Sequence, residues 1–118
     1  MPLYLSVIRI DENDTPEGGP SEQLMEDMGK LIDEMTKAGV LLDTAGLKPT
    51  AEGKRVHLRG GQLSTTDGPF TESKEVIGGY AIFQTKDEAE ALEWTKRFLL
   101  IHGDQWNITC EVREMERP

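Results

Sequence analysis

The segment from Thr65 to Gln84, TTDGPFTESKEVIGGYAIFQ, restricts the fold more than any other part of the chain. Gly68 precedes a proline, which disfavours a helical backbone, and Pro69 has a fixed φ angle and no N–H donor. Asp67 therefore begins a sharp turn. Its carboxylate is expected either to cap this turn by accepting a backbone hydrogen bond, or to stand at the mouth of a cleft as a functional group.

A strand is predicted directly after the turn, from Val76 to Gln84. Alternation places Tyr80 and Ile82 on one face and the other apolar side chains on the opposite face. Gly78 and Gly79 weaken a regular strand, so they predict a β-bulge or the close approach of another backbone. Tyr80 is a candidate for a hydroxyl that points into a cavity; the alternative is a buried tyrosine with a satisfied hydrogen bond.

The order of motifs in this segment resembles the DGPF branch of the YCII-related family: Asp67–Phe70, then Thr71–Glu75, then the pair Gly78–Gly79. A looser likeness extends over nearly the whole chain. The resemblance implies one α+β domain over residues 1–118, with a ferredoxin-like split βαβ fold that dimerises into an α/β barrel. It also implies a largely uncharacterised role. Some relatives look like small-molecule enzymes with a His–Asp pair in a cleft. Relatives in the wider family carry a histidine near the first helix, and the first helix predicted here contains none.

Composition limits the partners of the chain. The 118 residues suffice for one domain, and their net charge is -9. This excludes nucleic acid as the main partner, because phosphate binding needs a clustered positive surface. No apolar run approaches the roughly 20 residues that cross a bilayer, and the N-terminus has no signal-peptide pattern. We therefore expect a cytoplasmic protein. The resemblance implies a homodimer, and a small-molecule ligand is a second expected partner.

Neither a cofactor nor a metal ion is predicted. The two histidines and the one cysteine have no recognisable ligand spacing. Cys110 lies in an alternating apolar segment and is predicted to be a buried, inert thiol. The acidic loop 11–20 is interpreted as a solvated edge, with a metal site as the weaker alternative, because it lacks the spacing of an EF-hand loop. Neither a phosphate-binding glycine motif nor a nucleophile elbow occurs.

The spacing of apolar residues predicts the strands and the helix in the first half of the chain. Residues 3–10 form a strand with apolar side chains on both faces, which favours a central position. Ser21 is the expected N-cap of a helix that ends before Gly39. A short strand is expected at 40–42, followed by an irregular segment.

The second helix and the last strand close the predicted fold. Thr85 is the expected N-cap, with Glu88 completing a capping box. His102 occupies the last turn, where a local role at the helix C-terminus is preferred over catalysis. The final strand is predicted from 106 to 115.

A β-hairpin is predicted from strands at 54–59 and 62–66, joined by a Gly–Gly turn. Arg55, His57 and Arg59 alternate onto one hairpin face, and Val56 and Leu58 onto the other. The basic row is either a solvated face paired with nearby carboxylates or a wall that binds an anion, since arginine offers a planar fork to such groups.

These expectations combine into an antiparallel sheet with two helices on one face and an extra hairpin. The opposite face is predicted to meet water or a second subunit, and to carry the basic row together with Thr109, Glu111 and Arg113.

The candidate site is a cleft for a small organic anion. His57 and Asp67 are its predicted acid–base pair, and the substrate-binding residues are Arg55, Arg59, Phe70 and Tyr80. Two alternatives stay open: a non-catalytic regulatory or ligand-binding module associated with transcriptional regulation, and a scaffold without a pocket.

Overall fold

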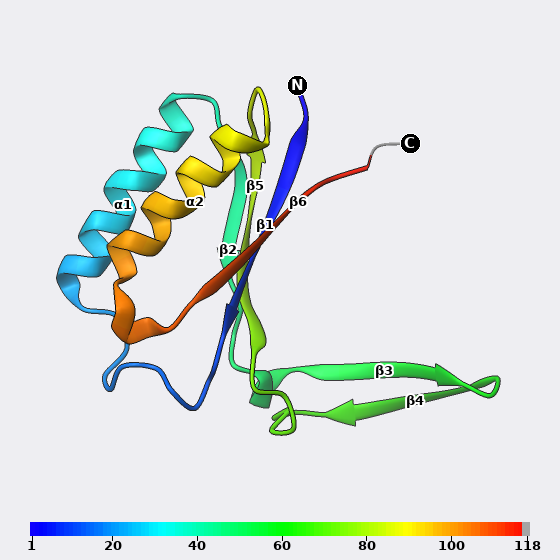
Figure 1. Ribbon diagram of the computed structural model, residues 1–118. Helices are drawn as coiled ribbons and strands as arrows, with labels where there is room; N and C mark the ends of the chain where they lie inside the picture. Colours follow the sequence, from blue (N-terminus) through cyan, green and yellow to red (C-terminus); the bar gives the residue numbers. More distant parts are fainter. Residues whose placement is uncertain (117–118) are drawn as a thin grey trace.

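The computed structural model describes residues 1–116, which form six strands and two helices with two short 3₁₀ turns (Figure 1). In chain order the elements are β1 (Leu3–Ile10), α1 (Glu22–Lys37), β2 (Leu41–Gly46), η1 (Thr50–Glu52), β3 (Lys54–Arg59), β4 (Gln62–Asp67), β5 (Val76–Gln84), α2 (Glu88–His102), η2 (Asp104–Trp106) and β6 (Thr109–Glu114).

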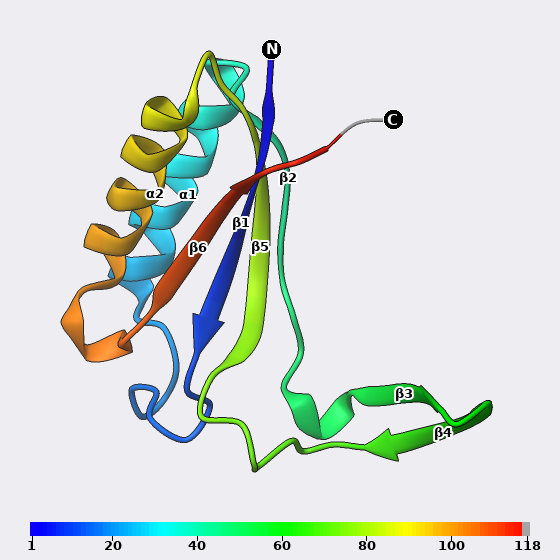
Figure 2. The same ribbon diagram turned by 45° about the vertical axis from the view of Figure 1, so that its right-hand side comes forward.

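The main sheet is antiparallel with the strand order β2-β5-β1-β6, and both helices lie on one of its faces (Figures 1 and 2). This confirms the predicted α+β architecture with two helices on one side, and it is consistent with a ferredoxin-like fold. The central position expected for β1 is confirmed, because β1 pairs with β5 on one side and β6 on the other.

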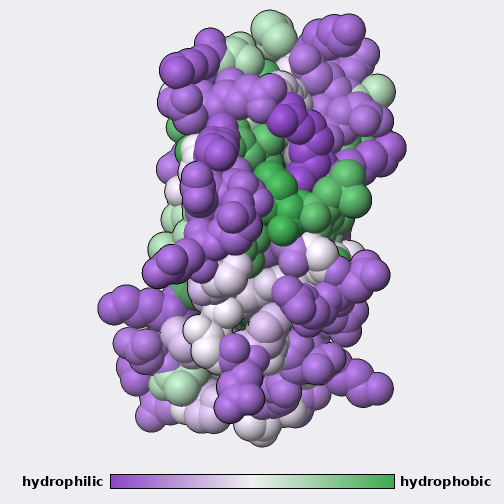
Figure 3. Space-filling model, turned by 90° about the vertical axis from the view of Figure 1, so that its left-hand side faces the viewer, coloured by the Kyte–Doolittle hydropathy of each residue, from purple (hydrophilic) through white to green (hydrophobic). Residues whose placement is uncertain are grey.

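The core lies between the helices and the sheet. Six buried apolar side chains form it: Tyr4, Leu31, Met35, Val40, Phe83 and Ala91. The helix α1 begins where the sequence predicts, because the Ser21 hydroxyl accepts a hydrogen bond from the Leu24 N–H at 3.0 Å. Seen from the helix-covered side, the surface is largely hydrophilic with an apolar band near its middle (Figure 3).

The double glycine of β5 does what the sequence predicts. The pairing of β1 with β5 shifts register next to this pair. A Cβ atom on Gly79 would stand 2.8 Å from the Ala45 carbonyl oxygen, and one on Gly78 would stand 2.8 Å from the Ile10 side chain. Both close approach and bulge are therefore confirmed. At Gly79 only glycine lets the β2 backbone come this near, whereas at Gly78 the neighbour is the end of the Ile10 side chain.

The hairpin is the main departure from prediction. Strands β3 and β4 form a separate two-stranded sheet that projects from the helix-free side of the molecule (Figures 1 and 2). The basic row Arg55, His57 and Arg59 therefore does not share a face with Thr109, Glu111 and Arg113. Strand β2 extends to Gly46 and occupies the position beside β5, so the hairpin does not pair with β5.

Three element boundaries also differ. Asp87, not Thr85, is the N-cap of α2, and its carboxylate accepts from the Glu90 N–H at 3.0 Å. Thr85 is instead fully buried, and its hydroxyl donates to the Asp87 carbonyl at 2.8 Å. Strand β2 is longer than predicted, and β6 is shorter because the 3₁₀ turn η2 contains Trp106. Neither helix of residues 1–116 is long and apolar enough to cross a membrane.

Candidate functional site

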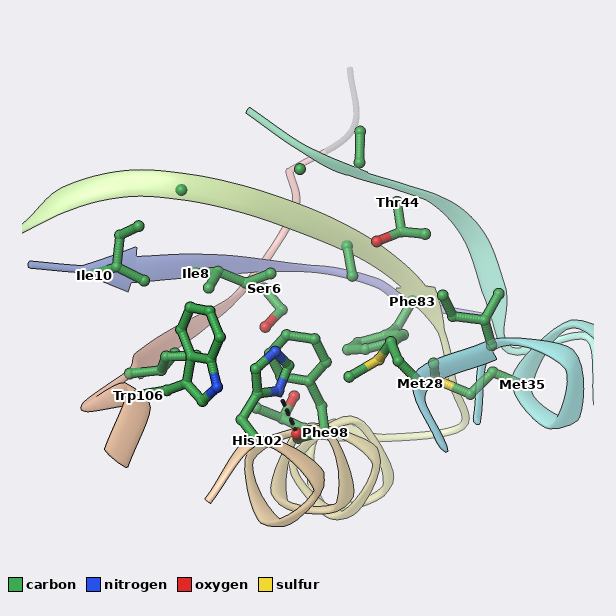
Figure 4. A pocket seen from close by; sticks show the side chains of 17 residues that line it. Ser6, Ile8, Ile10, Met28, Met35, Thr44, Phe83, Phe98, His102 and Trp106 are labelled. Carbon is green, nitrogen blue, oxygen red and sulfur yellow. Dashed lines mark hydrogen bonds between the residues drawn. The ribbon is translucent and has the colours of Figure 1, made fainter. Parts of the chain in front are cut away.

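A cavity of about 450 Å³ lies between the two helices and the helix-covered face of the sheet. Strands β1, β2 and β5 supply its floor, which is the upper side in Figure 4, and α1, α2 and η2 supply the opposite wall. Apolar side chains dominate the lining: Ile8, Ile10, Met28, Ile32, Met35, Phe83, Phe98, Trp106 and Ile108, with Ala45 and Ala81. The small residues Gly46 and Gly78 belong to the floor, so the glycine of the β-bulge also leaves space above the sheet.

His102 is the titratable side chain of this lining. It comes from the last turn of α2, and its Nδ1 lies 3.0 Å from the Phe98 carbonyl oxygen. A carbonyl only accepts, so Nδ1 carries the proton of this bond and Nε2 is the acceptor nitrogen of the neutral ring. The imidazole is held between two aromatic rings, with ring centres 4.5 Å from Phe98 and 5.9 Å from Trp106.

Three hydroxyls belong to the same cavity, those of Ser6, Thr44 and Thr95, and the Thr44 hydroxyl donates to the Tyr80 carbonyl at 2.8 Å. Ser6 projects from β1 toward the side of the cavity where His102 lies (Figure 4). It is buried next to Cys110, whose thiol has its pKa raised by burial and lowered in part by a hydrogen bond with Ser6. The Thr95 hydroxyl donates to the Ala91 carbonyl at 2.9 Å, which leaves its oxygen lone pairs as acceptors.

This arrangement suits a mostly apolar molecule with one polar group. Among the described residues, the lining contains neither a carboxylate nor an arginine or lysine. Apolar walls with a few convergent polar groups are the usual composition of small-molecule sites, and volumes of about 300–1,000 Å³ are typical. A hydroxyl on the ligand could donate to Nε2 of His102, and a carbonyl on the ligand could accept from the Ser6 hydroxyl.

The predicted pair His57 and Asp67 lies on the hairpin, outside this cavity. Directly opposite residues of an antiparallel ladder share a face, and the register pairs His57 with Ser64 and Asp67 with Lys54. His57 and Lys54 are three residues apart and so lie on opposite faces. Within one chain the structure thus does not bring His57 and Asp67 together. Asp67 instead accepts from the Lys54 ammonium, with Nζ and Oδ1 2.8 Å apart.

Arg55 and Phe70, two predicted substrate-binding residues, do come together. The guanidinium carbon lies 3.9 Å from the centre of the Phe70 ring. Arg55 also forms an ion pair with Glu72. The pKa of Glu72 is lowered, first by a hydrogen bond from its own backbone N–H and then by Arg55. Arg55 is therefore already engaged at the base of the hairpin, whereas Arg59 is exposed near its tip.

Tyr80 lies on the sheet face away from the helices. It pairs with Val7 in the β1 register, one position from the cavity-lining Ala81. Its hydroxyl donates to the Asp43 carboxylate at 2.7 Å, and this bond is the first cause of a raised Tyr80 pKa. Tyr80 consequently belongs to the helix-free face and not to the cavity.

The Asp67–Phe70 corner anchors the hairpin to the body. A Cβ atom on Gly68 would stand 1.7 Å from the Thr50 carbonyl oxygen, so no larger residue fits at this position. Glu12 accepts hydrogen bonds from the Thr50 N–H and hydroxyl, and the Thr50 hydroxyl oxygen accepts from the Phe70 N–H at 3.3 Å. The motif thus fixes the base of the hairpin, and its residues do not line the cavity.

Sequence reasoning did not locate the cavity, although Thr95 and His102 stand in one helical row of α2 whose other members are apolar. Two polar residues in an otherwise apolar row, together with Ser6 on the apolar face of β1, were the available signal. Alternation alone could not show that these three polar positions surround a space, because that depends on how far the helices stand from the sheet. Within residues 1–116, no group of three or more His, Cys, Asp or Glu side chains could hold a metal ion.

Fold and cavity together define an α+β domain in which a helix pair and a sheet enclose a small apolar site. The chain matches the YCII-related domain over residues 3–106 and belongs to that family. It is also similar to an uncharacterized protein of Rhizobium meliloti (strain 1021), with 29% identity over 96 residues, which are 80% of this chain and 77% of that protein.

Proposed function

We propose that this protein binds a small, mostly apolar organic molecule in the cavity between helices and sheet, and that it does so as a homodimer. The observation that carries the proposal is the cavity itself, of about 450 Å³, with His102 at one side. An engaged imidazole, a buried serine and a buried threonine are unusual neighbours for a packing gap, which is ordinarily lined by apolar atoms alone.

The ligand chemistry follows from the lining. The small anion expected from the basic row of the hairpin gives way to a neutral molecule, because among residues 1–116 the cavity wall carries no arginine or lysine. An aromatic or alicyclic ring system with one hydroxyl or carbonyl fits the apolar walls and the polar end. If the ligand is transformed, His102 is the lining residue that can move a proton, through Nε2.

The helix-free face supports the homodimer. Leu5, Val7 and Ile82 form its half-buried apolar centre, and the two helices of the chain lie on the other side (Figure 2). A sheet covered on one face needs a second cover when its other face is apolar. We also assign the chain to the DGPF branch of its family, on the Asp67–Phe70 motif and the Gly78–Gly79 pair.

Ligand binding is tested with three neutral probes: N-phenyl-1-naphthylamine, 1-naphthol and naphthalene. The fluorescence of the first probe should rise on mixing with the protein, and 1-naphthol should displace it. Ala81→Leu places a larger side chain in the cavity, so it should weaken binding of all three probes by about tenfold or more. Ala89→Leu, at an exposed position of α2, is the matched control and should leave binding unchanged.

The polar end is tested by comparing His102→Gln with His57→Gln on the hairpin. His102→Gln should weaken 1-naphthol by up to about tenfold, the value of one hydrogen bond, and leave naphthalene unaffected. His57→Gln should alter neither. Absence of probe binding to the wild type, or equal effects of Ala81→Leu and Ala89→Leu, would contradict the cavity as the site.

A further inference from the structure

The hairpin formed by β3 and β4, residues 54–67, is an arm that leaves the body on the side without helices (Figures 1 and 2). Body and arm give the molecule two long dimensions and a thin third one, 46 × 43 × 18 Å. Six-residue strands are about 20 Å long. The arm therefore extends away from the main sheet, from one end of it and on the side of its free face (Figures 1 and 2).

One face of the arm is apolar and exposed. Val56, Leu58 and Leu63 have exposed fractions of 70%, 71% and 76%. Leu58 and Leu63 are directly paired across the ladder, and Val56 lies two residues before Leu58, so all three share that face. A lone two-stranded hairpin is marginally stable in water. An apolar face on such a hairpin gains stability only when another surface covers it.

The charge of the arm is opposite to that of the body. The charged residues of 54–67 are Lys54, Arg55, Arg59 and Asp67, which give this segment a net charge of +2. Since the whole chain has a net charge of -9, the rest of the chain has a net charge of -11. Lys54 and Arg55 are paired with carboxylates of their own chain. Within residues 1–116, Arg59 forms no ion pair, and it stands next to the turn at the tip. The surface that best complements this arm is apolar with acidic surroundings.

We propose that the arm clasps a second copy of this chain, with the apolar face of Val56, Leu58 and Leu63 against the partner's acidic body. The inference rests on the proposed homodimer and says how it is held. Two packed sheets lie about 10 Å apart. An arm of about 20 Å beside the free face must therefore extend past the partner's sheet and along its side. The acidic bodies repel each other, and the basic arms reduce that repulsion.

The arm cannot hold the dimer alone. One face of a hairpin about 20 Å long and 10 Å wide is small beside the roughly 800 Å² per partner of a standard interface. The free sheet face, with Leu5, Val7 and Ile82, supplies the remaining contact. The clasp thus adds to a sheet-to-sheet contact, and its removal should weaken the dimer without abolishing all affinity.

The test is the dimer dissociation constant of the full chain, measured by sedimentation equilibrium. Leu58→Ser and Leu63→Ser together should raise this constant by at least about tenfold. Both side chains are exposed in one chain, so the far-ultraviolet circular dichroism of the variant should equal that of the wild type. Leu100→Ser, at a position of α2 that is 80% exposed, is the matched control and should leave the constant unchanged.

Two further measurements locate the contact. Arg59→Gln removes one positive charge from the arm and should weaken the dimer at low salt, and its difference from the wild type should shrink as the salt concentration rises. Amide hydrogen exchange of residues 54–67 should slow as the protein concentration rises from the monomer range to the dimer range. If the wild type dimerises and the Leu58/Leu63 variant has the same dimer dissociation constant, the proposed clasp is overturned and the homodimer stands. A wild type that stays monomeric at 100 μM would overturn both, while probe binding in the cavity is judged separately.

Discussion

The body and the arm of this protein are built from strands of similar length, yet they differ in what holds them. In the body, each strand of the sheet has helices above it, and side chains such as Leu31 and Phe83 are almost fully buried. In the arm, all twelve strand residues are exposed or half-buried, and its three large apolar side chains point outward. The comparison teaches that ladder pairing alone can define a shape without providing a core.

The largest expected effect separates core from arm. Leu31→Ala removes a side chain that is 2% exposed and should lower the free energy of unfolding by about 2–5 kcal/mol. Leu58→Ala removes one that is 71% exposed and should change it by less than about 0.5 kcal/mol in dilute monomer. Urea unfolding at submicromolar concentration measures both. Similar losses for the two variants would erase the distinction between the regions.

The joint between the two regions gives the next effect. Gly68→Ala places a Cβ atom on the Thr50 carbonyl oxygen, a backbone atom, and should cost about 2 kcal/mol or more. Gly29→Ala lies inside α1 with no atom within 4 Å of the added Cβ, so it should stabilise the chain by about 0.5–1 kcal/mol. The two glycine variants are compared by urea unfolding, and a neutral Gly68→Ala would show that the close approach at the joint can relax.

The smallest effect concerns the contact between the two helices of the body. Glu34 on α1 forms an ion pair with Arg97 on α2, and hydrogen bonds from Arg97 lower the Glu34 pKa below its ordinary value of 4.5. A carboxyl whose pKa is lower in the folded state stabilises the fold above its unfolded pKa. That stabilisation is lost as the pH falls from about 4.5 through the lower folded value.

Thermal unfolding between pH 3 and pH 6 checks this contribution. Glu34→Gln should flatten the fall in stability within that range, and the change should be small because both side chains are about half exposed. Glu93→Gln removes a carboxylate that is paired with Lys96 on the same helix, and it controls for the change in net charge. Identical pH profiles for wild type and Glu34→Gln would show that the helix-to-helix ion pair does not contribute.

Much of the body was predictable because its signals are local or periodic. The bounds of β1 and β5 and the Ser21 cap follow from alternation and side-chain hydrogen bonding, and in the arm the hairpin turn follows from glycine geometry. The second helix cap was missed because Thr85 and Asp87 both have capping side chains. Packing decides between them: Thr85 is buried at the end of β5, and Asp87 is left to bond the Glu90 N–H.

The candidate site was not predictable from the same signals. The sequence singled out His57, Asp67 and Tyr80 as chemically capable residues, but the structure places them on different faces and outside the cavity. His102 was recognised as the residue at the end of α2, where its ring bonds the Phe98 carbonyl. That the same ring also lines a cavity depends on the distance between α2 and β1.

The sequence by itself determined which segments are strands and helices, which side chains share a face, and why glycine is needed in β5, because these properties arise between residues close in the chain. Only the tertiary structure decided that the hairpin leaves the sheet and that Ser6, Thr95 and His102 surround one space. Both outcomes depend on long-range packing: β2 takes the edge beside β5, and the helices stand far enough from the sheet to leave a cavity.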